Sequence, residues 1–352
     1  IRLQAMFLQD TVDPKEAQTA LYEFLREFKT SPRATLIAGT LYAQIGDLKS
    51  AKLEFRNTVE QAGFQRKILL EVTRRQIAVK DLDGAQWTLQ KILTSRPNDL
   101  EAGSLYARLL LTNSRFEEAR QEIDALREHH GDILTLKRLD ALWWTNQREF
   151  AKAASILEQA MANEPSSTLM SELFQARMRN GDWAKGISEL EAWLKAKPDD
   201  YLIVDLLAQT RLHRGEFKEA GVLYEKLHAR APTSIAILNN LAMIYQRAND
   251  PRAIKLAERA YELAPNVPAI ADTYGWILTE QGQAEKGLPL LRNAFARESR
   301  DRGIRYHLAL ALKALGRIDE ARKELEGALE GDEKFVDYEA AKALLKEINQ
   351  RS

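Results

Sequence analysis

Residues 201–234 read YLIVDLLAQTRLHRGEFKEAGVLYEKLHARAPTS, and this stretch predicts the fold of the whole chain. Its apolar residues form two stripes with spacings of three and four: Val204, Leu207, Ala208 and Leu212, then Ala220, Tyr224 and Leu227. Such spacing places apolar side chains on one face of a helix. Gly215 lies between the stripes, where a positive φ ends a helix without a Cβ penalty. The stretch is therefore predicted to be two helices joined by a short turn.

The same pattern recurs along the chain with a period near 34 residues. Six segments occupy the turn between the two helices: GDLKSA, SRFEEA, REFAKA, GDWAKG, GEFKEA and GRIDEA. Five prolines recur in one phase, separated by 68, 33, 34 and 33 residues: Pro97, Pro165, Pro198, Pro232 and Pro265. A fixed period of this length indicates a repeat protein, in which each unit packs only on its neighbours.

Within a unit, numbered from its first residue (Tyr201 is position 1 of 201–234), positions with a structural role tend to hold one type of residue. A small residue at position 8 lets the two helices approach closely, and another at position 20 does the same on the second helix. The small residues at position 8 are Gly39, Ala107, Ala141, Ala208, Ala242, Gly275 and Ala309. Proline at position 32 ends the second helix. Two units depart from the pattern: residues 167–200 have Phe174 at position 8, and residues 66–99 have Thr73 at position 8 and Lys80 at position 15.

This pattern resembles the tetratricopeptide repeat (TPR) family, whose helix–turn–helix unit has 34 residues. The resemblance implies an all-α, right-handed α-solenoid of stacked helix pairs. Full repeats are expected at 32–65, 66–99, 100–133, 134–166, 167–200, 201–234, 235–267, 268–301 and 302–334. Residues 1–31 are expected to form a truncated first repeat, with Ala5, Leu8, Ala17 and Leu21 in the family's pattern positions, and further repeats are expected upstream.

The last segment of the chain follows a different pattern. Its apolar residues mark one amphipathic helix: Phe335, Val336, Tyr338, Ala341, Leu344, Leu345 and Ile348. A solenoid exposes an apolar end unless a terminal helix covers it. We therefore expect two parts, a solenoid over 1–334 and a C-terminal capping helix over 335–352.

Composition argues against several classes of protein. The chain has 51 basic and 51 acidic side chains, whereas a nucleic-acid binder normally carries a basic excess. No apolar run approaches the roughly 18 residues of a membrane span, so a membrane attachment would need an anchor outside this chain. The absence of Cys removes disulfides and thiol chemistry. Because the chain begins with Ile1, it is expected to be a piece of a longer protein.

No motif in the chain supports catalysis, a metal site or a cofactor. His129 and His130 precede Gly131, where an imidazolium suits the negative end of a helix. Residues 81–84, DLDG, resemble the start of a calcium loop, but Ile92 stands where glutamate is required. Gly282 and Gly287 have the spacing of a phosphate loop without its lysine, and both positions are explained by the repeat. The chain is therefore expected not to be an enzyme.

In the TPR family, the first helix of each repeat lines a concave groove, chiefly through positions 2, 5, 6, 9, 12 and 13. The residues at these positions include Arg74, Arg108, Arg138, Gln175, Arg179, Gln209, His213, Asn239, Asn240, Gln246, Arg247, Asp272 and Trp276. A lining of Arg, Asn and Gln suits an extended peptide or another polar chain; alternatively, these side chains only form a solvated helix face. Binding is expected to involve mainly 138–276. Replacing Arg179, Asn239, Asn240 and Arg247 with Ala is expected to spare the fold, because these are not packing positions.

The tryptophans and the residues that chaperone-binding TPR proteins require further limit the ligands expected in the groove. Trp144 and Trp183 lie at packing positions and are expected in the core, whereas Trp276 is either a ligand platform or a partly buried packing residue. Chaperone-binding TPR proteins need Lys and Asn at fixed positions of consecutive first helices, and only Asn240 matches. Binding of a chaperone tail is therefore not expected.

The C-terminal part resembles a narrower family, the TPR lipoproteins of the exosortase (PEP-CTERM) protein-sorting system. The likeness is carried by DPRAIKLAERAYELAP at 250–265, DTYGWIL at 272–278 and the FVDYEAAKALLKEI cap. It implies a scaffold in a bacterial envelope assembly linked to exopolysaccharide production or protein sorting, anchored on the periplasmic side of an outer membrane. Two alternatives remain: a cytoplasmic TPR adaptor of a multiprotein complex, and an RNA-binding helical repeat of the pentatricopeptide kind, which the charge balance disfavours.

Overall fold

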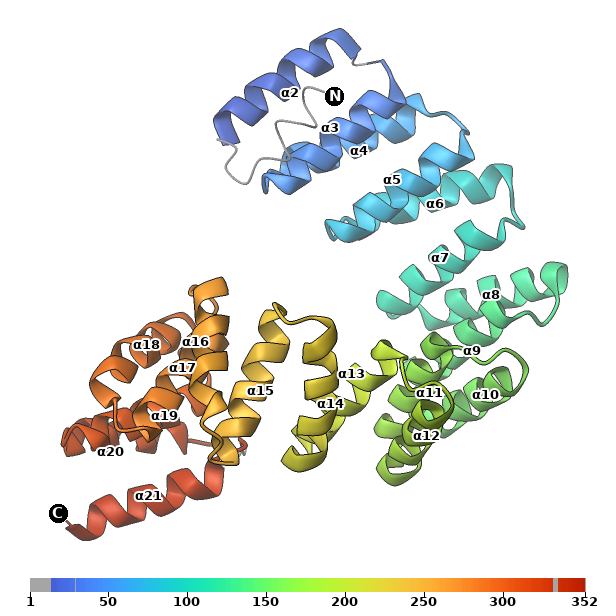
Figure 1. The fold of residues 1–352 in the computed structure, drawn as a ribbon. Helices are drawn as coiled ribbons and strands as arrows, with labels where there is room; N and C mark the ends of the chain where they lie inside the picture. Colours follow the sequence, from blue (N-terminus) through green and yellow to red (C-terminus); the bar gives the residue numbers. More distant parts are fainter. Residues whose placement is uncertain (1–13, 29, 332–334, 352) are drawn as a thin grey trace. The chain divides into compact units, whose positions relative to one another are not determined.

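The computed structural model describes residues 14–28, 30–331 and 335–351, and every regular element in these ranges is an α-helix (Figure 1). The helices form two compact units, unit 1 over 1–186 and unit 2 over 187–352. The prediction of an all-α repeat fold is confirmed.

Unit 1 is built from successive helix pairs. Its helices are α2 (Pro14–Phe28), α3 (Pro32–Gln44), α4 (Leu48–Gln61), α5 (Arg66–Ala78), α6 (Leu82–Ser95), α7 (Leu100–Thr112), α8 (Phe116–His130), α9 (Leu134–Asn146), α10 (Phe150–Asn163) and α11 (Ser167–Arg179). The odd-numbered helices are the first helices of their repeats. First helices also contact each other directly, α3 with α5 and α7 with α9, so the repeats stack.

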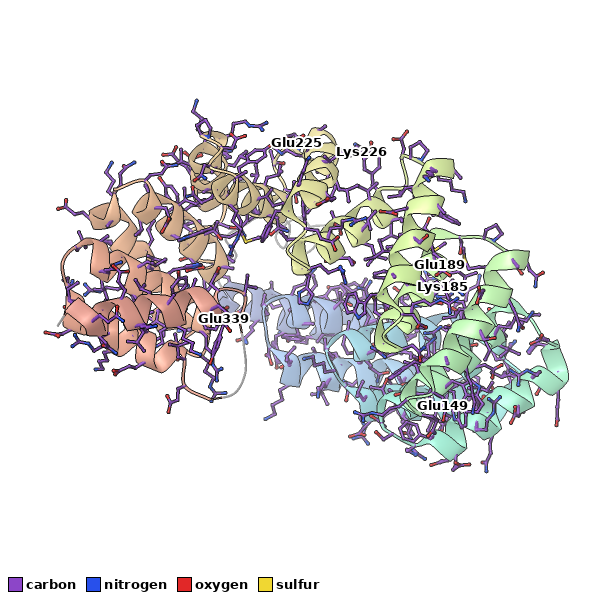
Figure 2. All side chains as sticks on the ribbon, turned by 90° about the horizontal axis from the view of Figure 1, so that it is seen from below. Glu149, Lys185, Glu189, Glu225, Lys226 and Glu339 are labelled. Atoms are coloured by element: carbon purple, nitrogen blue, oxygen red, sulfur yellow. The ribbon has the colours of Figure 1, made fainter. Side chains whose placement is uncertain are left out.

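Unit 2 continues the same arrangement. Its helices are α13 (Tyr201–His213), α14 (Phe217–Arg230), α15 (Ile235–Arg247), α16 (Arg252–Leu263), α17 (Pro268–Glu280), α18 (Ala284–Arg297), α19 (Arg302–Ala314), α20 (Ile318–Ala328) and α21 (Tyr338–Arg351). The helix α12 (Trp183–Ala196) begins in unit 1 and ends in unit 2. Glu225 and Lys226 lie on α14, and each forms an ion pair with another residue of unit 2 (Figure 2).

The small residues at positions 8 and 20 set the closest helix approach. A Cβ built on Gly287 of α18 would lie 2.5 Å from the carbonyl oxygen of Gly275 on α17, so this pair packs backbone against backbone. In α11 and α12 the small residue is on one side only. Phe174 is buried, and its ring lies 3.1 Å from where a Cβ of Gly186 would be. Gly186 therefore makes the room that lets residues 167–200 keep a large side chain at position 8.

Position 15 adopts the left-handed backbone conformation in every described repeat, whatever its residue. Five of these positions hold glycine, with φ from +73° to +84°: Gly46, Gly181, Gly215, Gly282 and Gly316. The other four hold Lys80, Ser114, Arg148 and Asn249, with φ between 54° and 61°. The stacked helices therefore impose this turn even where a side chain makes it unfavourable.

Side-chain caps fix where several helices begin. The carboxylates of Asp47, Asp99 and Asp301 accept hydrogen bonds from the backbone N–H three residues later, at 3.1, 3.1 and 3.0 Å. Each bond satisfies one N–H that the first turn of a helix leaves without a partner. Asp99 also has a lowered pKa, chiefly because Arg66 donates a hydrogen bond to it.

The helix α21 packs against α20 at the C-terminal end of unit 2. Ala341, Leu344 and Ile348 are buried in one apolar cluster with Leu325 of α20. The helix begins at Tyr338, three residues later than its apolar pattern begins, and Val336 is 80% exposed and so lies outside the buried face. The capping role remains a proposal that this packing supports.

Residues 1–13, and with them the pattern positions Ala5 and Leu8, lie outside the described residues. Among the described helices, none combines the length and the apolar character that crossing a membrane requires.

Candidate functional site

The first helices of unit 1 share one hollowed face. Four hollows lie along it, with volumes of about 740, 560, 560 and 200 Å³ in order from α3 to α11. Neighbouring hollows share lining residues: Lys67 and Arg75 join the first two, Arg66 and Glu101 the next two, and Arg108 the last two. We call this continuous surface the unit 1 groove.

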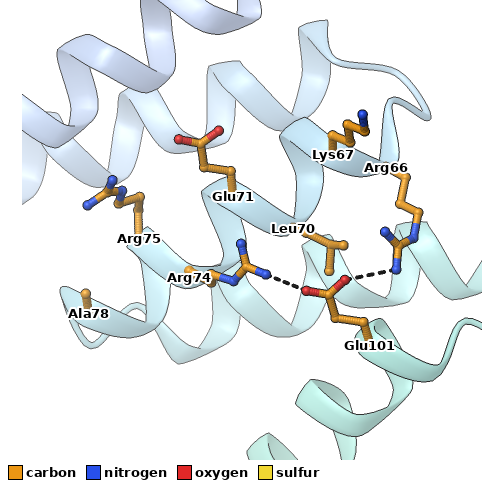
Figure 3. A pocket seen from close by; sticks show the side chains of 8 residues that line it. All are labelled: Arg66, Lys67, Leu70, Glu71, Arg74, Arg75, Ala78 and Glu101. Carbon is orange, nitrogen blue, oxygen red and sulfur yellow. Dashed lines mark hydrogen bonds and ion pairs between the residues drawn. The ribbon is translucent and has the colours of Figure 1, made fainter.

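The middle of the groove is crossed by ion pairs between neighbouring first helices. Arg66 of α5 donates to Asp99 at 2.8 Å and to Glu101 of α7 at 3.0 Å. Arg74 also pairs with Glu101 (Figure 3). Because Asp99 caps α7, its bond to Arg66 ties the start of one first helix to the start of the next. These ion pairs neutralise Arg66 and Arg74, two of the positive charges in the groove.

A second bridge crosses the groove further along. Arg138 of α9 donates to both oxygens of Glu172 on α11, with Nε 2.9 and 3.1 Å from them. Arg108 of α7 lines the same hollow and is partly buried, but the hydrogen bonds of Glu172 go to Arg138. Burial, then the charge of Arg138, lower the pKa of Arg108, while Glu172 opposes them through space. Arg108 is therefore a partly desolvated cation to which no described carboxylate binds directly.

The groove carries an excess of positive charge. Its lining contains eight basic side chains, Arg33, Arg66, Lys67, Arg74, Arg75, Arg108, Arg138 and Arg179, and four acidic ones, Glu71, Asp99, Glu101 and Glu172. Among the described residues, five of these cations have no ion pair or hydrogen bond to an acidic side chain: Arg33, Lys67, Arg75, Arg108 and Arg179. Since the whole chain is neutral, this excess is local.

All five predicted groove residues of unit 1 line these hollows. They are Arg74, Arg108, Arg138, Gln175 and Arg179. Sequence reasoning did not single out Arg33, Lys67, Arg66 and Arg75. Arg33 and Lys67 lie at position 2, one of the family's groove positions, and could have been predicted. Arg66 lies at position 1 and Arg75 at position 10, which are not groove positions of the family.

The predicted groove residues of unit 2 mostly face partners within the unit. Gln209 is exposed and donates to Asp205 at 2.7 Å, and His213 is exposed. Asn240 donates to the hydroxyl of Tyr224 at 2.8 Å, and burial raises the pKa of that hydroxyl to about 12. The neighbouring Asn239 is partly buried, as is Gln246. Asn240 therefore acts in packing, because it satisfies a phenol that is otherwise in the core.

The remaining three predicted residues of unit 2 converge on His307 of α19, which is buried. Its Nδ1 lies 2.9 and 3.0 Å from the two oxygens of Asp272 on α17. Its ring stacks on that of Trp276, with centroids 5.0 Å apart and planes at 12°. Arg247 of α15 lies over the same tryptophan at 5.5 Å. Trp276 is therefore partly buried against His307, which favours packing among the two roles left open for it.

Arg247 connects this cluster to the C-terminal segment. It donates to both oxygens of Asp337 at 3.0 and 3.1 Å, just before α21 begins. The Nε2 of His307 lies 3.9 Å from the same carboxylate. Arg247 and Asn240 thus contact other parts of unit 2, so the expectation that both can be replaced without affecting the fold stays a prediction, which these contacts disfavour.

The remaining side chains singled out for chemistry have structural contacts. Both histidines at the end of α8 contact Asn98. Nε2 of His130 lies 2.8 Å from the backbone oxygen of Asn98, and Nδ1 of His129 lies 3.3 Å from its side-chain nitrogen. Trp144 is partly buried in the core of unit 1 and lies under the ammonium of Lys152. Trp183 is partly buried at the start of α12.

Family models identify the repeat. Two models, both described as tetratricopeptide repeat, match residues 76–139 with 278–348 and residues 171–235, together more than half of the chain. We find no significant match among curated proteins.

The chain is also similar to solved structures. The chain is similar to one in the crystal structure of the APC/C hetero-tetramer Cut9–Hcn1, with a TM-score of 0.52 and 14% identity over 90% of this chain. It spans 63% of the length of that relative. A tetratricopeptide repeat protein from Parabacteroides merdae has a TM-score of 0.47 and 15% identity, over 70% of this chain and 98% of its own. The TPR protein TTC0263 from Thermus thermophilus has a TM-score of 0.41 and 24% identity, over 51% of this chain and 99% of its own.

Proposed function

The chain is a tetratricopeptide repeat protein, and we propose that it is a non-catalytic scaffold that binds a protein partner through the unit 1 groove. Proteins of this family are generally non-catalytic scaffolds for protein–protein interaction. The observation that carries the proposal is the continuous run of four hollows over α3, α5, α7, α9 and α11.

The groove is better suited to a partner than the corresponding face of unit 2. Unit 1 presents unpaired cations and exposed amides such as Gln175 there. In unit 2, Arg247, Asp272 and Asn240 already bind other residues of the unit. We therefore place the binding surface nearer the N-terminus than 138–276.

Site-specific photo-cross-linking tests this proposal. A photoreactive amino acid at Gln175, in the groove, is expected to capture a protein partner in cells of the source organism. The same amino acid at Lys255, exposed on α16, serves as the matched control. Capture at position 255 but not at 175 would contradict a binding role for the groove.

The C-terminal resemblance supports a finer proposal, that this scaffold serves an envelope assembly linked to exopolysaccharide production or protein sorting. In that setting the protein is anchored on the periplasmic side of an outer membrane. A cytoplasmic adaptor of a multiprotein complex is the alternative. Fractionation of cells that express the natural full-length protein separates the two, since recovery in the soluble cytoplasmic fraction would contradict the envelope role.

A further inference from the structure

We propose that the partner segment bound in the unit 1 groove is an extended acidic peptide that carries an apolar side chain near one end. This inference rests on the proposed function and adds the chemical class of the ligand. It is carried by two independent features of the groove, its uncompensated charge and its apolar first hollow.

The charge comes from what remains after the ion pairs are formed. The acidic Asp99, Glu101 and Glu172 are bound by Arg66, Arg74 and Arg138, so among the described lining residues only Glu71 opposes the five free cations. These cations lie on α3, α5, α7 and α11, so they are spread along the groove. Such a row attracts a chain with carboxylates at several positions more strongly than it attracts a single anion.

Among the five free cations, Arg108 gives the strongest evidence for an acidic ligand. A partly buried guanidinium loses hydration, and that cost is recovered when a carboxylate binds to it. Glu172 does not fill this role, because it already binds Arg138 through both oxygens. A carboxylate of the ligand would complete the site between Arg108 and Arg179, which line the same hollow.

The first hollow distinguishes a peptide from other polyanions. Leu36, Ile37, Leu41 and Ile68 line it together with Arg33, Lys67 and Arg75. Ile37 is 38% exposed there. An apolar surface of this kind stabilises a Leu- or Phe-sized side chain, which a polysaccharide of acidic sugars does not carry. We therefore favour a peptide over an acidic polysaccharide.

Geometry sets the length of the ligand. Successive first helices pack about 10 Å apart, so the four steps from α3 to α11 cover about 40 Å. An extended peptide advances about 3.3 Å per residue, so about 12 residues fill the groove.

The test measures fluorescence anisotropy of labelled peptides of about this length with the purified chain. The probe peptide contains Glu, Ser and one terminal Leu. Three matched peptides replace every Glu with Gln, every Glu with Lys, or Leu with Ser. We expect the Glu peptide to bind most tightly, to weaken as salt rises, and to weaken when Leu is removed.

Charge reversal in the protein locates the site. The variant R75E/R108E/R179E is expected to bind the Glu peptide about tenfold or more weakly, since one ion pair of this kind changes affinity by about that factor. The control K218E/R230E/K255E changes the net charge equally, at exposed positions of α14 and α16, and is expected to bind as the wild type does. If the groove variant does not fold, the comparison of Glu and Gln peptides on the wild type decides.

Equal affinity for the Glu and Gln peptides would overturn the acidic ligand while leaving a peptide-binding groove in place. Equal losses in both triple variants would overturn the groove as its site. Binding of alginate without binding of the Glu peptide would overturn the peptide in favour of an acidic polysaccharide. Failure of the proposed function itself would appear separately, as cross-linking at position 255 but not at 175.

Discussion

The imidazole of His307 donates from Nδ1 to Asp272, which lies one repeat earlier at the adjacent helix position. Residues at positions 5 and 6 of successive repeats are thus paired, and Arg138 and Glu172 are related in the same way in unit 1. In unit 1 the Arg138–Glu172 pair leaves Arg108 without a carboxylate partner among the described residues. In unit 2 the His307–Asp272 pair is covered by Trp276 and Arg247. One pairing rule therefore gives an open groove in one unit and a buried cluster in the other.

The buried cluster makes the stability of unit 2 depend on pH. Although burial and Arg247 lower the pKa of His307, the carboxylates of Asp272 and Asp337 outweigh them and raise it above its ordinary value. A raised pKa in the folded state means that the stabilisation is present at low pH and is lost as pH rises through that pKa. Thermal unfolding of the wild type and H307Q is expected to differ most below about pH 6.5, the ordinary pKa of histidine, and to converge as pH rises above it. A difference that grows with pH would contradict this assignment.

The ion pair between Arg247 and Asp337 is expected to hold the start of α21. Both side chains are less than a third exposed, so D337N is expected to destabilise this contact by about 1–2 kcal/mol. Hydrogen exchange of the α21 amides measures the effect. The control D319N removes an ion pair with Arg322 in which the carboxylate is 94% exposed, and is expected to change little. Equal exchange in both variants would show that Arg247 does not hold the helix.

The left-handed position 15 offers a test of how far stacking imposes local structure. Replacing Lys80 or Arg148 with Gly relieves the Cβ strain at φ near 60° and is expected to stabilise the protein by about 0.5–1 kcal/mol. Asn249→Gly is expected to gain less, because Asn tolerates this conformation better. Chemical denaturation measures all three. A loss of stability in K80G and R148G would contradict the strain argument.

Backbone packing between α17 and α18 is expected to be sensitive to a single methyl group. In G287A the new Cβ would lie 2.5 Å from the carbonyl oxygen of Gly275, so the helices must move apart, at a cost of about 1–3 kcal/mol. The control is G221A on α14, where the nearest atom is 3.4 Å away at Ile244, an ordinary contact. It is expected to be neutral or slightly stabilising. Similar melting temperatures for the two variants would contradict this close approach.

The fold was predictable because each turn of the repeat carries its own signal. Gly215 and Pro232 mark one repeat, and residues such as Gly46 and Pro97 repeat the same phase. The site was predictable only in part. Family positions found Arg108 and Arg138, but they could not show which side chains would bind one another. Arg247 binds Asp337, which lies 90 residues away in the sequence. This contact depends on where the C-terminal segment packs in unit 2, and the repeat pattern does not predict that position.

The proposed binding surface is the first-helix face of unit 1. Hydrogen–deuterium exchange with and without the Glu peptide tests it most directly, since bound segments exchange more slowly. We expect slower exchange in α5, α7 and α9, with no change in the second helices α6, α8 and α10. Slower exchange confined to the second helices, or to unit 2, would contradict it.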